Sequence, residues 1–125
     1  MEANNFRRGL LFTADPYSKV MNQEDKKTAT LFGDGATVTL LTDEPVFEFG
    51  QFVFGSDGSK KEGIVVREDG YVHMNGRAVF TFTVRIIPDS IREMLEKNSF
   101  VLENVNRFLL HQGSLHIVNS IADNL

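Results

Sequence analysis

His111 is the residue whose type and position most clearly favour chemistry in this sequence. It ends a short apolar run over residues 108–110, and an amphipathic pattern begins just after it at Leu115. A histidine at the carboxyl end of a buried strand lies where open α/β sheets place their ligands, and imidazole exchanges protons near neutral pH. We therefore take His111 as the candidate catalytic residue. On position alone, a purely structural role for it remains the alternative.

The second informative feature is the absence of cysteine from the 125 residues. The chain cannot by itself supply the nucleophile of a thiol mechanism, a disulfide or a thiolate metal site. Its three histidines, at positions 73, 111 and 116, lack the spacing of zinc ligands, so no metal site is expected. Surface or loop roles are expected for His73 and His116.

Composition indicates a soluble globular protein, with 42% hydrophobic and 24% charged residues. The net charge is −4, and the basic doublets at residues 7–8, 26–27 and 60–61 are separate rather than joined in a stripe. Both features argue against a nucleic-acid partner. No stretch has the roughly 18 apolar residues of a membrane span, and the first dozen residues lack the order of a signal peptide. The default compartment is the cytoplasm.

The first half of the chain predicts several strands. Residues 9–14 form an apolar run before Asp15-Pro16, typical of a strand buried on both faces. Residues 28–32 and 36–41 predict two further strands around a tight turn at Gly33-Asp34-Gly35, which lacks the lysine and following helix of a phosphate-binding loop. The alternating residues 46–54 predict a strand before a polar surface loop over residues 55–61. Its four phenylalanines favour a packed sheet face over base stacking, because acidic residues lie nearby.

The second half favours helices. From Asn75 the apolar period changes from two towards 3.6, which predicts a helix that Pro88 bends or interrupts. Ser90 and Glu93 fit a capping box for a new helix that runs to Asn98. Residues 105–110 predict a short buried strand. One face of a last helix is marked by Leu115, Val118, Ile121, Ala122 and Leu125. The order of elements suggests a mixed α/β layer fold.

Both ends of the chain are expected to be cut from a larger fold. The last helix reaches Leu125 without a usual stop signal, and the first strand begins after only a few polar residues. Such a piece would expose strand edges and an apolar helix face, which favours self-association.

Four blocks of sequence, in this order along the chain, together resemble β-ketoacyl-acyl-carrier-protein synthase III, a thiolase-like condensing enzyme. They are residues 31–36 (LFGDGA), 74–80 (MNGRAVF), 84–88 (VRIIP) and 108–112 (FLLHQ). The resemblance implies a duplicated, layered α/β/α/β/α fold more than twice this length. The chain would cover the end of its first half, residues 1–72, and the start of its second half, residues 73–125.

The resemblance also implies a reaction. In this family a cysteine is acylated by acyl-CoA, and a histidine and an asparagine then assist decarboxylation of a malonyl-thioester and its condensation with the acyl group. His111 falls on that histidine, whereas the cysteine would lie upstream of Met1 and the asparagine beyond Leu125. No permanently bound cofactor is implied, since acyl-CoA is a substrate. Without a thiolate, the chain alone is expected to be inactive.

Substrate-binding positions follow from the same resemblance. The pantetheine tunnel of the family corresponds to Gly76, Val79 and Phe80. Gly113 and Ser114 replace the alanine-asparagine pair usual after His-Gln. The arginine that stacks on the CoA adenine appears as Lys26, which keeps the charge but loses the planar face.

Two macromolecular partners are implied. The basic residues that dock an acyl carrier protein would fall on positions that hold no fixed cation here, namely Thr81, His116, Asp123 and Asn124. A homodimer of the full-length protein would place contacts at residues 29–41. The alternative from another class is a non-catalytic dimerisation or ligand-binding module.

Overall fold

The computed structural model describes residues 6–125 and combines helices with two small antiparallel sheets, so the predicted α/β class is confirmed. The chain divides into two compact units, Met1–Phe49 and Gly50–Leu125. The two family halves expected at residues 1–72 and 73–125 are a separate prediction.

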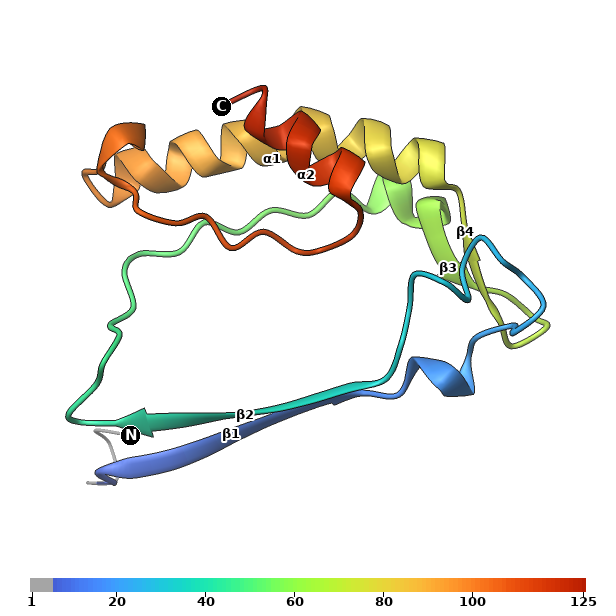
Figure 1. The fold of residues 1–125 in the computed structure, drawn as a ribbon, viewed down its shortest axis with the longest axis horizontal. Coiled ribbons are helices and arrows are strands. Elements are labelled where there is room, and N and C mark those ends of the chain that lie inside the picture. Colours follow the sequence, from blue (N-terminus) through green and yellow to red (C-terminus); the bar gives the residue numbers. More distant parts are fainter. Residues whose placement is uncertain (1–5) are drawn as a thin grey trace. The chain divides into compact units, whose positions relative to one another are not determined.

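The first unit is built on a long hairpin (Figure 1). Strand β1 (Arg8–Asp15) pairs with β2 (Gly35–Thr42), with Arg8 opposite Thr42 and Asp15 opposite Gly35. The strand predicted over residues 9–14 is confirmed, but its predicted burial is wrong, since Leu10, Leu11 and Phe12 are 51–71% exposed. The reason is that β2 is the only strand that pairs with β1 among the described residues.

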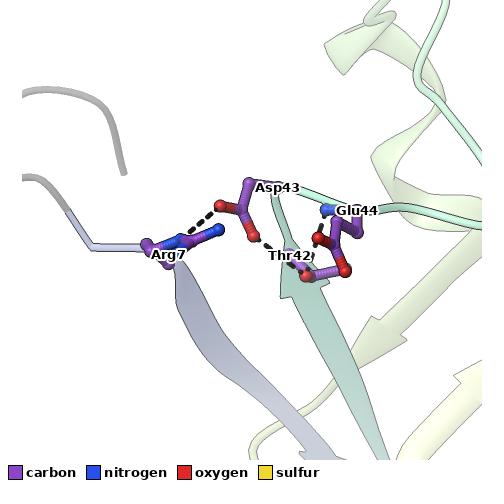
Figure 2. A network of polar contacts seen from close by, with 4 residues as sticks. All are labelled: Arg7, Thr42, Asp43 and Glu44. Carbon is purple, nitrogen blue, oxygen red and sulfur yellow. Dashed lines mark hydrogen bonds and ion pairs between the residues drawn. The ribbon is translucent and has the colours of Figure 1, made fainter.

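A polar cluster joins the two strands at the open end of this hairpin. Figure 2 shows the Arg7 guanidinium directed at Asp43, and Arg7 Nε donates to Asp43 Oδ2 at 2.6 Å. The backbone N–H of Asp43 donates to the Arg7 carbonyl at 3.3 Å, and that of Glu44 donates to the Thr42 hydroxyl at 3.2 Å. All four side chains lie near the surface, so the pair is expected to add only a few tenths of a kcal/mol up to about 1 kcal/mol.

The strand predicted over residues 28–32 is wrong, because these residues form successive turns. Asp25 organises them: its Oδ2 accepts from the Thr28 hydroxyl at 2.9 Å, and its carbonyl accepts from Ala29 N at 2.8 Å. Thr28 is fully buried beneath this turn. Local side-chain bonds of this kind compete with a ladder and win here.

The tight turn predicted at Gly33-Asp34-Gly35 is also absent. Gly33 and Asp34 are irregular, and Gly35 already belongs to β2. The Asp34 carboxylate accepts from Ser18 N and Ser18 Oγ, both at 2.7 Å, and so ties the start of β2 to the 3-10 turn η2 (Tyr17–Lys19). Tyr17 stacks on Phe32 beside this contact, with ring centroids 4.9 Å apart.

The strand predicted over residues 46–54 is not formed, so the packed sheet face expected for its phenylalanines is absent. Phe47, Phe49 and Phe54 are 78–90% exposed. In the second unit, the backbone of Gln51 is instead held by the Asn98 side chain, which accepts from Gln51 N at 2.7 Å and donates to Gln51 O at 3.0 Å. A side chain thus supplies the hydrogen bonds that a neighbouring strand would have made.

A short hairpin in the second unit was missed from the sequence. Strands β3 (Ile64–Val66) and β4 (Val72–Met74) pair antiparallel around a turn at Gly70, whose φ is 79°. The dipeptide Asp69-Gly70 between two β-branched runs is the signal that could have revealed it. The 3-10 segment η3 (Gly58–Gly63) lies just before β3 and includes the end of the predicted polar loop.

One helix, α1 (Gly76–Lys97), runs through Pro88, so the predicted break and the capping box at Ser90 and Glu93 are wrong. The Asn75 side chain caps its start by accepting from Ala78 N at 3.1 Å. A proline inside a helix costs about 3 kcal/mol because a hydrogen bond is lost. Burial of Pro88 and Ile91 offsets part of that cost and keeps the helix continuous.

The predicted last helix is confirmed as α2 (Leu115–Ala122), which packs along α1 (Figure 1). Ile121 is 3% exposed and belongs to the core, whereas Leu115 is 76% exposed. Between the helices lie the 3-10 turn η4 (Leu102–Asn104) and residues 105–110, which are irregular. The buried strand predicted there is wrong, since no neighbouring strand pairs with it and Leu109 is 94% exposed.

Across residues 6–125, no helix combines the length and the apolar character needed to cross a membrane.

Candidate functional site

His111 lies on the exposed irregular segment that leads into α2. Its ring lies against Gly113: a methyl group added at position 113 would meet His111 Cδ2 at 3.5 Å and Nε2 at 3.8 Å. The same methyl would meet Ile117 Cδ1 at 3.8 Å. Within residues 6–125, neither ring nitrogen of His111 has a hydrogen-bond partner. The imidazole is therefore open to bind a group from outside this chain.

The residues after His111 fix the backbone around it. Gln112 Nε2 donates to the Leu110 carbonyl at 2.9 Å, and Ser114 Oγ accepts from Ile117 N at 3.2 Å to cap α2. The Ser114 hydroxyl is thus already used as a helix cap. Substrate binding by Gly113 and Ser114 stays a prediction.

The predicted tunnel residues Gly76, Val79 and Phe80 occupy the first turns of α1. Phe80 stacks on His116 of α2, with ring centroids 4.7 Å apart and an interplanar angle of 1°. This contact brings the start of α1 to the helix that follows His111. Val79 is directed elsewhere, because its Cγ2 would lie 3.7 Å from a Cβ at Gly63. Phe80 thus packs on α2, whereas Val79 lies against η3, so the two side chains contact different elements.

Lys26, the predicted CoA contact, belongs to the first unit and is exposed in the turns that follow Asp25. Its carbonyl accepts from the Thr30 hydroxyl at 3.0 Å. Binding of CoA by Lys26 together with the predicted tunnel residues of the second unit therefore stays a prediction.

The other two histidines have side-chain partners. His73 Nε2 lies 2.8 Å from Asp69 Oδ2 across the β3–β4 turn, and His116 stacks on Phe80. Neither contact was predicted from the sequence pattern. Among the described residues, His111 is the histidine without such a partner. No cluster of three or more potential metal-binding side chains occurs in that part of the chain.

Three aspartates outside the predicted site have lowered pKa values because they accept hydrogen bonds. The backbone N–H and then the hydroxyl of Ser18 lower the pKa of Asp34. The hydroxyl and then the backbone N–H of Ser59 act on Asp57, and the backbone N–H of Tyr71 followed by His73 acts on Asp69. Each carboxylate stays charged near neutral pH.

Asp34 gives a testable pH dependence. Because its pKa is lower when folded than when unfolded, its stabilising effect is complete at neutral pH and is lost as the pH falls below the ordinary aspartate value of roughly 4. We expect Asp34→Asn to destabilise the chain at neutral pH and the difference from the unsubstituted chain to vanish in acid, by chemical denaturation at a series of pH values. Asp123→Asn is the control. A difference that stays constant with pH would contradict the expectation.

Comparison with known proteins identifies what this arrangement is similar to. The family model for 3-oxoacyl-[acyl-carrier-protein] synthase III matches residues 1–58. A β-ketoacyl-[acyl-carrier-protein] synthase III of Clostridium perfringens is 34% identical over 139 aligned positions, which include 99% of this chain and 42% of that protein. The chain thus spans about two fifths of the length of the curated relatives it matches.

Solved structures agree with the sequence match. A crystal structure of 3-oxoacyl-(acyl-carrier-protein) synthase III superposes with a TM-score of 0.86 and 30% identity, over 99% of this chain and 44% of that one. The priming β-ketosynthase of the R1128 polyketide pathway gives a TM-score of 0.84 and 25% identity, over 99% and 41%. The resemblance inferred from the four sequence blocks and the partial thiolase-like fold are both confirmed.

Proposed function

Since the chain is related to the β-ketoacyl-acyl-carrier-protein synthase III enzymes, we propose that it supplies part of the active site of such an acyltransferase, with His111 as the catalytic residue. The reaction is the decarboxylative condensation of an acyl-CoA with a malonyl-thioester in fatty-acid or related biosynthesis. The observation that carries the proposal is the open imidazole of His111, which lies in the block of sequence that carries the family resemblance.

The proposed chemistry is electrostatic. Loss of carbon dioxide from a malonyl-thioester leaves an enolate, so negative charge develops on the thioester oxygen. A hydrogen-bond donor aimed at that oxygen stabilises the transition state by about 3–4 kcal/mol. His111 can donate from either ring nitrogen, because neither is engaged by another described residue. Gly113 lies beside its ring and would restrict the positions that the imidazole adopts.

The 125-residue chain alone should not condense, because no cysteine is present to form the acyl-enzyme. We expect no ketoacyl product above the buffer rate when the purified chain is mixed with acetyl-CoA and malonyl-CoA, as followed by mass spectrometry. Denatured chain is the matched control. Turnover above the rate of that control would contradict the requirement for a thiolate from outside this chain.

Partners and location belong to the same proposal. Acyl-CoA and a malonyl-thioester are the proposed substrates, and acyl carrier protein is the proposed thioester carrier, as the name of the Clostridium perfringens relative suggests. A cytoplasmic location fits these substrates. Homodimer formation through residues 29–41 is proposed for the full-length protein.

A second candidate is a non-catalytic association module. The exposed apolar side chains of the β1–β2 hairpin favour it, since Leu10, Phe12, Val38 and Leu40 are 57–71% exposed. Two measurements together distinguish the candidates: sedimentation of the purified chain, and the effect of His111→Ala on the condensation rate. Self-association with no effect of His111 on catalysis would favour the module.

A further inference from the structure

A groove between η3 and the first half of α1 contains a hollow that is lined by neither His111 nor the predicted tunnel residues Gly76, Val79 and Phe80, although Thr81, a predicted carrier-protein docking position, borders it. Figure 1 shows η3 beside this part of the helix, and the two elements are in contact. This hollow has a volume of about 640 Å³, which is in the range of small-molecule sites, roughly 300–1,000 Å³. Gly113 and Ser114 do not line it either.

Two parallel rows of α1 side chains border this hollow. Arg77, Thr81 and Arg85 are spaced by four residues and form a polar row, while Ala78, Phe82 and Ile86 form an apolar row one position further along. Residues four apart lie one above another on a helix. The hollow therefore has a cationic edge and an apolar edge that run side by side along the same two turns.

The geometry of the polar row suits a single anionic group. Arg77 and Arg85 are two turns apart, about 12 Å along the axis, with Thr81 midway between them. Each guanidinium would have to cover only about half that distance to reach an anion over the Thr81 hydroxyl. Both arginines are exposed, and within residues 6–125 neither has an ion-pair partner.

The charge of the hollow is opposite to that of the chain. Arg77, Arg85 and Lys60 border it together with one acidic residue, Asp57, whereas the chain carries a net charge of −4. The Asp57 carboxylate already accepts hydrogen bonds from Ser59 N at 3.0 Å and Ser59 Oγ at 2.6 Å. The arginines therefore dominate the field at the polar row, and an anion is favoured there over a cation.

We propose that this groove binds a soluble single-chain amphiphile with a phosphate monoester head, the phosphate held between Arg77 and Arg85 and the alkyl chain laid along Ala78, Phe82 and Ile86. Arginine forks match phosphate oxygens in geometry and charge. The apolar row gains stability when an alkyl chain covers it. A ligand held here would not contact the His111 ring, because His111 does not line the groove.

The test measures binding of decyl phosphate to the 125-residue chain by calorimetry. We expect saturable binding that weakens with added salt, and a loss of about tenfold in affinity for Arg77→Glu and for Arg85→Glu. Arg8→Glu, a charge reversal on β1, is the matched control and should leave the affinity unchanged. Circular dichroism checks that each variant stays folded, and Arg77→Gln and Arg85→Gln, which remove charge without reversing it, should weaken binding in the same direction.

Comparison ligands decide the chemical class. Inorganic phosphate and decanol should each bind much more weakly than decyl phosphate, because each offers only half of the recognised features. The proposal would be overturned if decanol bound as tightly as decyl phosphate. It would also be overturned if the arginine variants bound decyl phosphate as tightly as the unsubstituted chain. Cosedimentation with phosphatidic-acid vesicles in the absence of decyl phosphate binding would also overturn it and would assign the surface to a bilayer.

Discussion

Replacing His111 by alanine is expected to lower the condensation rate by on the order of 10²–10³-fold. The measurement uses a chimera in which this chain replaces the segment of the Clostridium perfringens relative that it matches, so that the rest of the fold is present. The physical reason is the loss of a hydrogen-bond donor at the thioester oxygen, where charge develops. Product formation from acetyl-CoA and a malonyl-thioester gives the rate.

His73→Ala is the matched control for that experiment. His73 is exposed and paired with Asp69 on the β3–β4 hairpin, so its loss should change the rate by no more than about twofold. Thermal melting establishes that both variants of the chimera are folded. Equal rates for the His111 and His73 variants would contradict the catalytic assignment, as would a folded chimera that has His111 and does not condense.

Replacing Ile121 by alanine is expected to cost about 2–5 kcal/mol of unfolding free energy in the second unit. Ile121 is 3% exposed on the helix that follows His111, and its truncation would leave a cavity where α2 packs on α1. Urea denaturation of the 125-residue chain followed by circular dichroism measures the change.

Leu115→Ala provides the control on the same helix. Leu115 is 76% exposed, so its truncation should change the unfolding free energy by no more than about 0.5 kcal/mol. Similar losses for the two variants would show that α2 does not depend on its buried face. In that case the packing of α2 on α1 could not be what positions the segment containing His111.

The sequence predicted those elements whose signals are local. The apolar run at the start of the chain predicted β1, and the pattern after His111 predicted α2. Asp69-Gly70 carried an equally local signal for the β3–β4 hairpin, which was missed. The turns around Thr28 could not be predicted from β propensity. Residues 28–32 favour a strand, but Asp25 accepts hydrogen bonds from the Thr28 hydroxyl and from the backbone N–H of Ala29.

The wrong strands have a common physical reason. An alternating or apolar run becomes a strand only when another segment completes its ladder, and neither residues 46–54 nor residues 105–110 have such a neighbour in the described part of the chain. Pro88 is the reverse case, in which packing keeps a helix that local preference would interrupt. Both outcomes depend on contacts distant in sequence, which a local pattern does not contain.

The candidate site was predictable in part. The residue type and the buried strand expected before it selected His111. That strand is absent, and His111 lies on an exposed irregular segment, so its catalytic role stays a prediction. The Phe80–His116 stack and the closeness of the His111 ring to Gly113 could not be predicted, because they depend on how α1, α2 and the preceding loop pack.

Decarboxylation of malonyl-CoA by the chimera, with no acyl-CoA present, tests the role of His111 most directly, because it isolates the step that needs the hydrogen-bond donor. Carbon dioxide release should be well above the buffer rate when His111 is intact and should fall to near that rate in His111→Ala. Equal release from the two proteins would contradict the claim that this imidazole stabilises the enolate.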